Sequence, residues 1–477
     1  LTNASTGAAA THSNGAANTF AVTNSVTTFD TVDPSGAGSG GAVVVDPITT
    51  DGYTITFASN GPSTNAPADV ATVANGVVTI TKESTFAVSG SSNSGQIVVD
   101  VDKTAYPDSV VELDLTGVEL SNSTTAPIYV ASIGDEVQIV AKKDTVNTIS
   151  DGTSHTQTYT DSDGNTNTVE GAIFSRDDIK FKGSGTLTVN GNTDDAIVCK
   201  NDIKIFNGSL IVNAVDDGIR GKDSVTIGDT TKSDGSAADN SGLSVTVKTQ
   251  SGDGIKSTAT DTATDKSYGL VTINGGTVNI TSYADGIQAE QDLVINGGDL
   301  TIKTYQGSSY TGTGSSSSSG STNPWGGGMG MDGNANKTDI SAKGIKSVGL
   351  YDEAGTTWQS KGNITINGGN INIDSSDDCV HCGGDMKLYG GVFNVASADD
   401  GFHSDHTLDI GQTVGNTFDN VQIFISKCYE GVEAPTINQN SGTVYVISTD
   451  DGYNASGGSD GSGTANPGGP GRGWGQG

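Results

Sequence analysis

Short runs of alternating apolar and polar residues recur along most of the chain, and they predict β-strands. A clear unit spans Ala284–Lys303. It contains the apolar runs Ile287–Ala289, Leu293–Ile295 and Leu300–Ile302, which are separated by turns rich in Gly, Asn and Asp. Alternating runs of this length between such turns are typical of strands. Three short strands in one repeat predict a triangular coil.

The repeat is marked by a three-residue phrase in which an acid, or once a lysine, precedes a small residue and then a branched or aromatic apolar residue. Its nine copies begin at Asp195, Asp217, Asp253, Asp285, Lys343, Asp378, Asp400, Glu430 and Asp451. The shortest gaps are 21 and 22 residues, a period typical of solenoids. We therefore expect an all-β, right-handed parallel β-helix with three strands per coil and about 21–22 residues per basic coil.

Composition and strand pattern divide the chain into four segments. Residues 1–41 form a low-complexity N-terminal segment, and residues 456–477 form a Gly-rich C-terminal tail. Between them we expect N-terminal β coils or a cap over residues 42–95 and the β-helix over residues 96–455. Strands without the acid phrase are predicted at Tyr53–Phe57, Val77–Thr81, Val110–Leu115, Ile128–Val130, Val137–Val140, Ile173–Phe174, Ile179–Phe181 and Leu187–Val189.

The charge balance excludes some partners. The 477 residues include 55 acids and 23 lysines and arginines, which gives a formal net charge of −32. Such an excess argues against nucleic acid and anionic membranes and favours cations as partners. Apolar runs stay shorter than the roughly 18 residues of a membrane span, so we expect no membrane insertion. The chain begins at Leu1, which is compatible with a removed signal peptide and an extracellular or cell-surface location.

The four cysteines are expected to be buried free thiols. Cys379 occupies the small-residue slot of the repeat phrase, and Cys199 and Cys382 occupy another small-residue slot. Residues three apart on a strand are about 10 Å apart, which is too far for a disulfide. A metal or redox role for the pair Cys379 and Cys382 is the alternative.

Stacked coils place equivalent residues in columns, and one column is acidic. Like charges about 5 Å apart repel by roughly 3 kcal/mol at an effective dielectric near 20. Calcium relieves such repulsion because it takes 6–8 oxygen ligands at about 2.3–2.6 Å. The best candidates have doubled acids in neighbouring coils, at residues 194–195 with 216–217 and at residues 377–378 with 399–400. The full predicted ligand set is Asp194, Asp195, Asp216, Asp217, Asp253, Asp285, Asp377, Asp378, Asp399, Asp400, Glu430, Asp450 and Asp451.

The alternative is that these acids only shape turns, because Asp before Gly forms side-chain-to-backbone hydrogen bonds. Lys343 interrupts the column between Asp285 and Asp378. It fits an internal counter-ion where no metal sits. A sharper role is a catalytic base that removes a proton beside a calcium-bound uronate.

A second column, two residues after the small residue of the phrase, is mostly polar and basic in the middle. Its candidate carbohydrate-binding residues are Arg220, Lys256, Lys346, His381 and His403. A strip of cations beside calcium sites suits an anionic polymer such as a pectin. The alternative is a solvated face that balances nearby acids. His381 and His403 fall in neighbouring coils, where they form either a stacked surface pair or a transition-metal site.

Several stretches resemble a known family, the calcium-binding parallel β-helix carbohydrate-binding proteins of bacterial cell surfaces, which are related to family nine polysaccharide lyases. The matching stretches are Gly95–Asp100, Ala172–Asp178, Gly185–Asn190, Asp216–Val225, Gly252–Ser257, Ser341–Lys346 and Tyr429–Glu433. The resemblance covers about residues 45–455 and departs from the family pattern at Ala196, Cys379 and Cys382. It implies calcium held between coils, binding of cellulose-like or polygalacturonate chains, and no strong lyase activity.

Three functions are therefore in competition. The first is an extracellular, calcium-stabilised β-helix that binds a polysaccharide and is not an enzyme. The second is a protomer of a surface filament, which self-associates by strand addition from the alternating segments Phe20–Val22 and Val26–Phe29. The third is a calcium-dependent pectate-type lyase that uses Lys343.

Overall fold

The computed structural model describes residues 52–161, 163–232, 235–260, 268–311, 340–350, 357–412 and 421–455. The low-complexity segment 1–41, the proposed assembly strands within it, and the tail 456–477 lie outside the described residues.

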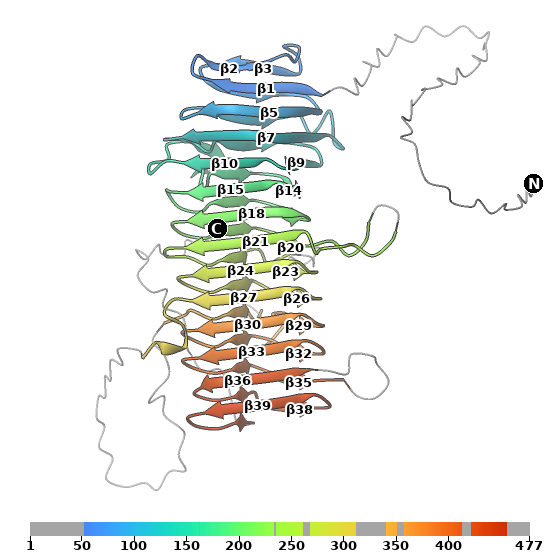
Figure 1. Ribbon diagram of the computed structural model, residues 1–477, viewed down its shortest axis with the longest axis vertical. Helices are drawn as coiled ribbons and strands as arrows, with labels where there is room; N and C mark the ends of the chain where they lie inside the picture. Colours follow the sequence, from blue (N-terminus) through green and yellow to red (C-terminus); the bar gives the residue numbers. More distant parts are fainter. Residues whose placement is uncertain are drawn as a thin grey trace, which may run out of the picture. The chain divides into compact units, whose positions relative to one another are not determined.

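Successive strands lie above one another in three stacks, which form the sides of the coil (Figure 1). In the first stack, the strands from β16 (Ile197–Cys199) onwards each begin at the apolar residue of the acid phrase. The strands of this stack are β3 (Ala71–Ala74), β4 (Val77–Ile80), β6 (Gln96–Asp100), β8 (Ile128–Ser132), β13 (Ile173–Ser175), β16 (Ile197–Cys199), β19 (Ile219–Gly221), β22 (Ile255–Ser257), β25 (Ile287–Ala289), β28 (Ile345–Ser347), β31 (Val380–Cys382), β34 (Phe402–Ser404), β37 (Val432–Glu433) and β40 (Tyr453–Asn454).

The second and third stacks are joined at their N-terminal end by β7 (Val110–Asn122), which pairs with both. The second stack comprises β9 (Glu136–Ala141), β14 (Asp178–Gly183), β17 (Asp202–Ile205), β20 (Ser224–Ile227), β23 (Leu270–Ile273), β26 (Leu293–Ile295), β29 (Ile364–Ile366), β32 (Met386–Leu388), β35 (Thr407–Ile410) and β38 (Thr436–Gln439). The third comprises β10 (Val146–Asp151), β15 (Thr186–Gly191), β18 (Gly208–Ala214), β21 (Leu243–Thr249), β24 (Thr277–Ser282), β27 (Asp299–Thr304), β30 (Asn370–Ser375), β33 (Val392–Ser397), β36 (Gln422–Cys428) and β39 (Thr443–Ser448).

The N-terminal end differs from the rest because it contains antiparallel pairs. β1 (Tyr53–Ala58) pairs antiparallel with β2 (Gly61–Thr64) and parallel with β5 (Ser84–Ser92). β3 pairs antiparallel with β4. A separate hairpin, β11 (Thr158–Thr160) and β12 (Thr166–Thr168), projects before β13 and was not predicted. The helical structure of the described residues is one 3-10 turn, η1 (Gly307–Ser309), and no helix among them has the length and apolarity to cross a membrane.

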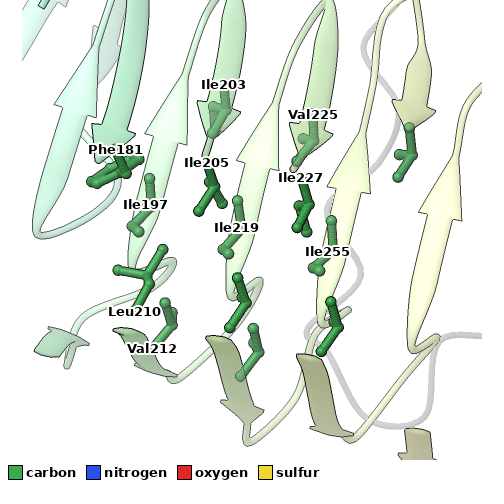
Figure 2. Packing of buried hydrophobic residues seen from close by; sticks show 14 of the residues in the cluster. Phe181, Ile197, Ile203, Ile205, Leu210, Val212, Ile219, Val225, Ile227 and Ile255 are labelled. Atoms are coloured by element: carbon green, nitrogen blue, oxygen red, sulfur yellow. The ribbon is translucent and has the colours of Figure 1, made fainter. Parts of the chain in front are cut away.

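Apolar side chains fill the interior of the coil, as Figure 2 shows for the region around Ile219 and Ile255. In-register pairing makes these columns continuous, since Ile219 pairs with Ile255 and Ile255 pairs with Ile287. Each of these three isoleucines is completely buried. Full burial of such a side chain stabilises the fold by about 1.5–3 kcal/mol. The alternating apolar pattern therefore gives every coil the same inner face.

These observations confirm the predicted all-β parallel β-helix with three strands per coil. The strands predicted in the unit that contains Asp285 are β25, β26 and the middle three residues of β27, which extends one residue before and two after the predicted strand. The strands predicted without the acid phrase coincide with or lie almost wholly within β1, β4, β7, β8, β9, β13, β14 and β15. The alternating pattern predicts these strands correctly because it is local, so each strand can be recognised without knowledge of its neighbours.

Close packing around the repeat phrase requires its second residue to be small. A Cβ atom added at Gly286 would lie 2.4 Å from the Ile302 Cγ2 atom and 2.5 Å from the Gly344 carbonyl oxygen. Ile302 belongs to an in-register column of the third stack, which holds valine at Val212 and Val395. These two valines occupy the coils whose phrases carry Ala196 and Cys379 instead of glycine. Valine also faces a glycine slot, since a Cβ atom added at Gly218 would lie 2.3 Å from the Val247 Cγ1 atom, so a facing valine does not by itself make room for a larger slot residue.

We predict that Gly286→Ala lowers the free energy of unfolding by about 1–3 kcal/mol, because the added methyl overpacks the slot. Gly297→Ala, in the same repeat, is the matched control, since its Cβ would lie 3.7 Å from the nearest atom, the Asn274 carbonyl oxygen. Denaturant unfolding of both variants tests this. Equal stability of the two variants would show that the slot is not tight.

Candidate functional site

The acid column runs along the turn that enters the first stack, and six of its acids accept a hydrogen bond from the next coil along the chain. The Asp195 Oδ1 atom accepts a hydrogen bond from the Asp217 backbone N–H at 2.9 Å, and Asp217 does the same for Asp253 at 2.8 Å. The remaining bonds of this kind join Asp253 to Asp285, Asp285 to Lys343, Asp378 to Asp400 and Asp400 to Glu430. One carboxylate oxygen thus has the turn-shaping role that was considered as the alternative, and the second oxygen remains for other partners.

In the half of the column nearer the N-terminus, from Asp195 to Asp285, the second carboxylate oxygen contacts basic residues of the second column, which is called the basic column below. The Asp195 Oδ2 atom accepts a hydrogen bond from Arg220 Nε at 2.6 Å. The Asp253 Oδ2 atom lies 2.7 Å from Lys256 Nζ, and the Asp285 Oδ2 atom lies 2.9 Å from Lys346 Nζ. The chain itself therefore supplies counter-charges here. Electrostatic repulsion between the carboxylates therefore does not require a metal ion at Asp253 or Asp285.

The basic residues are less exposed than their prediction as an outward strip implies. The side chains of Arg220, Lys256 and Lys346 are 19–26% exposed, and the His403 side chain is 0% exposed. The prediction of an outward-facing His403 is wrong, because that side chain is enclosed by neighbouring coils. The three longer side chains lie along the acids instead, which is the balancing role considered as the alternative.

Burial controls the protonation of these acids. Burial raises the pKa of Asp195 to about 6 even though Arg220 opposes it, and it raises the pKa of Asp253 to about 6 against Lys256. Burial also acts to raise the pKa of Asp285, but Lys346 and Lys343 outweigh it and leave that pKa below its usual value. Position along the column thus decides how readily each acid carries its charge.

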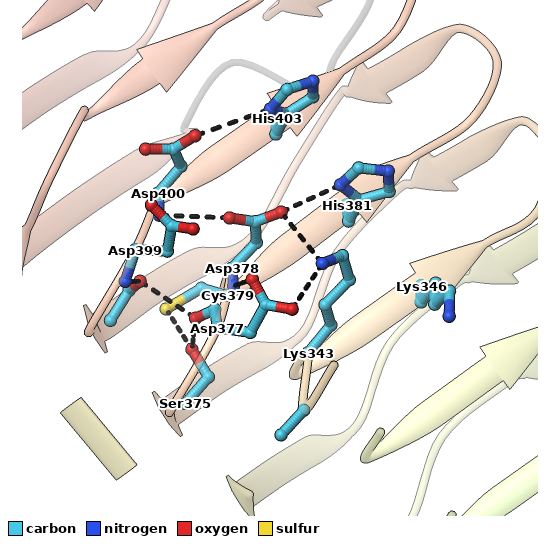
Figure 3. A network of polar contacts seen from close by, with 12 residues as sticks. Lys343, Lys346, Ser375, Asp377, Asp378, Cys379, His381, Asp399, Asp400 and His403 are labelled. Carbon is cyan, nitrogen blue, oxygen red and sulfur yellow. Dashed lines mark hydrogen bonds and ion pairs between the residues drawn. The ribbon is translucent and has the colours of Figure 1, made fainter. Parts of the chain in front are cut away.

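Lys343 stands where the column would otherwise hold an acid, and it is buried (Figure 3). Its Nζ atom lies 2.5 Å from the Asp377 Oδ2 atom and 3.5 Å from the Asp378 Oδ2 atom. The Asp378 backbone N–H donates instead to the Asp377 Oδ1 atom at 3.0 Å, since lysine offers no carboxylate. This is the geometry of an internal counter-ion. A buried ammonium does not reach a polymer lying on the surface.

A group of buried acids surrounds this lysine. Asp377, Asp378, Asp399 and Asp400 are each 0% exposed. One oxygen from each of Asp377, Asp378 and Asp399 lies within 4.8 Å of the others. Burial is the main reason that the pKa of Asp377 rises to about 7. Burial also acts to raise the pKa of Asp378, but Lys343 and His381 outweigh it and hold that pKa well below its usual range.

A second group of acids lies in the coils that contain β16 and β19. One oxygen from each of Asp194, Asp195 and Asp216 lies within 4.8 Å of the others. The Ser251 hydroxyl donates to the Asp216 Oδ1 atom at 3.2 Å. Burial and the nearby charge of Asp217 raise the pKa of Asp216. This group is therefore the second place where carboxylates converge.

The structure brings together only part of the predicted ligand set. Within the described residues, close groups contain Asp194, Asp195, Asp216, Asp377, Asp378, Asp399 and Asp400. The other predicted ligands lie outside such groups; they are Asp217, Asp253, Asp285, Glu430, Asp450 and Asp451. Asp450 and Asp451 are exposed on the last coil, and Glu430 accepts a hydrogen bond from Asn454 at 3.0 Å.

The two histidines form a stacked pair with different surroundings. Their ring centroids are 4.8 Å apart, with 25° between the planes. The His381 Nδ1 atom lies 2.8 Å from the Asp378 Oδ2 atom. The His403 Nδ1 atom lies 3.5 Å from the Asp400 Oδ2 atom and 3.2 Å from the Glu433 Oε2 atom. Burial acts to lower the pKa of His403, but the three carboxylates of Asp400, Asp405 and Glu433 raise it well above its usual value.

The cysteines are free and buried, as predicted. Burial raises the pKa of the Cys382 thiol to about 12, so it is protonated at neutral pH. Sequence reasoning did not select Asp405 or Glu433 as site residues. Glu433 stands in the same column as His403, which was the available signal, whereas Asp405 lies in a turn with no repeat signal.

Comparison with known proteins adds the family. A family model described as carbohydrate-binding domain-containing protein matches residues 74–401. The chain belongs to this family. A relative of the same description from Acetivibrio thermocellus is 35% identical over 181 residues, which are 38% of this chain and 60% of the relative. The chain thus spans about 60% of the length of that relative.

A solved structure is also similar in part. It is described as the polysaccharide lyase-like protein from C. thermocellum, gadolinium derivative. The alignment has 31% sequence identity and a TM-score of 0.45, and it covers 53% of this chain and 92% of that chain.

We predict that Lys343→Met destabilises the protein by about 3–5 kcal/mol in EDTA, because it leaves Asp377 and Asp378 buried without their ammonium. Lys248→Met, at an exposed position of β21, is the matched control and should change stability little. Urea unfolding of both variants measures the difference. A variant at residue 343 as stable as the control would contradict the counter-ion role.

Proposed function

We propose that this protein is an extracellular, calcium-stabilised carbohydrate-binding β-helix, which holds cellulose-like or polygalacturonate chains without strong catalysis. Membership of the carbohydrate-binding domain family supports the polysaccharide, and the name of the Acetivibrio thermocellus relative agrees with it. Both proposed polymers lie outside cells, which is the reason for the proposed extracellular or cell-surface location.

The observation that carries the calcium proposal is the complete burial of four carboxylates, Asp377, Asp378, Asp399 and Asp400, in two adjacent coils. Enclosing several charges of one sign is costly unless cations accompany them. Carboxylate oxygens separated by up to 4.8 Å suit a hard ion that binds oxygens at about 2.3–2.6 Å. When bound, calcium would cross-link the coils and offset their repulsion.

The donor set fits calcium, since Asp377, Asp378 and Asp399 offer only oxygens. Lys343 already contacts the Asp377 and Asp378 Oδ2 atoms, so these residues would hold the ion through their remaining oxygen capacity together with Asp399. The group of Asp194, Asp195 and Asp216 is the second candidate. There Arg220 contacts one oxygen of Asp195.

The polymer surface proposed here is the turn side beside the acid column. The tyrosines Tyr283, Tyr305 and Tyr310 lie on this side, with ring centroids 4.9 and 5.4 Å apart in edge-on contacts. Aromatic rings of this kind present apolar faces and a polar hydroxyl. Because Arg220, Lys256 and Lys346 are paired with acids, an anionic chain would need a calcium bridge at the partly exposed group of Asp194, Asp195 and Asp216, whereas a neutral chain would not.

We further propose that the protein is not a lyase. The residue considered as the base, Lys343, is 1% exposed and held between two carboxylates. An amine in that position is enclosed and held by two carboxylates, and both features make it unsuited to removing a proton from a polymer.

The test combines pull-down on insoluble cellulose and on polygalacturonate with thermal melts in calcium and in EDTA. We expect retention on one polymer, and a calcium stabilisation of about 3 kcal/mol at 100 times Kd. Asp399→Asn should lose most of the stabilisation, whereas the exposed Asp450→Asn should keep it. Retention that survives EDTA identifies a neutral chain, and retention that EDTA abolishes identifies an anionic one.

Two results would contradict this proposal separately. The carbohydrate part is wrong if neither polymer retains the protein in calcium. The calcium part is wrong if the melting temperature of the wild type is the same in calcium and in EDTA.

A filament protomer is the second candidate, and the last coil favours it. The strands β38, β39 and β40 each pair on one side among the described residues. Three apolar or aromatic side chains are exposed there, Tyr445 at 56%, Ile447 at 52% and Tyr453 at 42%. Open strand edges beside exposed apolar groups are a surface to which another strand can add.

If this end assembles, Ile447→Lys should shift the protein towards the monomer, because it places a charge in the contact. Val146→Lys is the control, since Val146 is 70% exposed on β10 near the other end. Light scattering coupled to size exclusion measures the mass. A wild type that stays monomeric at high concentration would eliminate the filament.

A further inference from the structure

We propose a second kind of metal site, at which His403, Asp400 and Glu433 bind a borderline divalent cation such as Zn²⁺. It is distinct from the oxygen-only calcium sites, and it requires neither the carbohydrate nor the calcium proposal. One ligand atom from each of these three residues lies within 4.8 Å of the other two.

Two successive coils build the site. Asp400 lies in the turn before β34, His403 lies within β34, and Glu433 lies on β37, where it pairs in register with His403. Asp400 and His403 are 0% exposed, and Glu433 is 5% exposed. Parallel stacking thus brings one imidazole and two carboxylates from two adjacent coils together in one enclosed place.

The separations suit a metal better than a proton. The His403 Nδ1 atom lies 3.2 Å from the Glu433 Oε2 atom and 3.5 Å from the Asp400 Oδ2 atom. Charge-assisted hydrogen bonds between such groups measure about 2.7–2.9 Å. In a tetrahedron with bonds of about 2.0–2.1 Å, neighbouring ligand atoms are about 3.3–3.4 Å apart. The two observed separations bracket this value.

The other side of the imidazole faces a carboxylate. The His403 Nε2 atom lies 3.5 Å from the Asp405 Oδ1 atom. This separation is also longer than a charge-assisted hydrogen bond, but the negative charge of Asp405 favours a proton on Nε2, which leaves the Nδ1 lone pair on the side of Asp400 and Glu433. Carboxylates that orient metal-bound histidines in this way are common in metal sites.

A protonated imidazole is the competing arrangement, and geometry separates the two. One N–H bond points in one direction, so it cannot align with both Asp400 and Glu433. A divalent ion bonds all three atoms at once. Its charge equals that of the two carboxylates, which matters in a buried place. Imidazole selects zinc-like ions over calcium, and a fourth position is left for a small ligand such as water.

The neighbouring histidine provides the control. The His381 Nδ1 atom lies 2.8 Å from the Asp378 Oδ2 atom, an ordinary hydrogen-bond length. Its ring stacks on His403 at 4.8 Å between centroids. His381→Gln therefore removes an imidazole next to the site without removing one of the three proposed ligands.

The experiment uses the untagged full-length chain, stripped with chelator and then kept in excess Ca²⁺ without polysaccharide. Zn²⁺ is titrated calorimetrically, and Co²⁺ is used as a spectroscopic probe. We expect one Zn²⁺ per chain and the strong visible absorption of tetrahedral Co²⁺. His403→Gln and Glu433→Gln should lose this binding, Asp405→Asn should weaken it by about 10–100-fold, and His381→Gln should leave it unchanged.

Two results would overturn the proposal. One is a wild type that binds Zn²⁺ no better than Glu433→Gln, or that shows the weak absorption of six-coordinate Co²⁺. The other is a loss of binding in His381→Gln as large as that in Glu433→Gln. Circular dichroism and melting without metal check the fold of every variant. If His403→Gln does not fold, Glu433→Gln and Asp405→Asn still decide. Failure here leaves the calcium and carbohydrate proposals standing, because their tests use no Zn²⁺.

Discussion

In-register stacking of parallel strands is the constraint on which the other features of this protein depend. Once Ile219, Ile255 and Ile287 lie above one another, every residue at a fixed offset from them also meets its own copies, about 4.8 Å away. Apolar residues benefit from this arrangement because it makes the core continuous. Acidic residues do not, so the chain has to supply partners for them at every level.

The structure shows two solutions to that problem. Between Asp195 and Asp285 the acids pair with side chains from the basic column, which remain partly solvated. Around Asp377 and Asp399 the acids are fully enclosed, and Lys343 and two histidines are their ion-pair partners among the described residues. At Asp253 and Asp285 the first arrangement needs no additional ion for charge balance. The second concentrates the features that favour metal ions, namely burial, convergence and oxygen or imidazole donors.

The strands and the column of acids were predictable from sequence because both depend on local spacing. The alternation over Leu293–Ile295 identifies β26 without knowledge of its neighbours. The role of each acid was not predictable in the same way. The pairing of Lys346 with Asp285 joins residues 61 positions apart, a separation that local spacing does not reveal. The burial of His403 depends on Glu433 in the next coil, which no property of residue 403 alone reveals.

The insertion of Lys343 in an otherwise acidic column also makes the coils non-interchangeable. The Lys343 backbone N–H donates to Asp285 in the preceding coil, and its ammonium contacts Asp377 and Asp378 in the following coil. Removing the coil that contains Lys343 would preserve the strand spacing and the hydrophobic interior. It would, however, place Asp285 directly next to Asp378. Copy number in such a protein is therefore restrained by electrostatic order along its axis, and evolution by whole-repeat duplication or loss would be easiest outside this level.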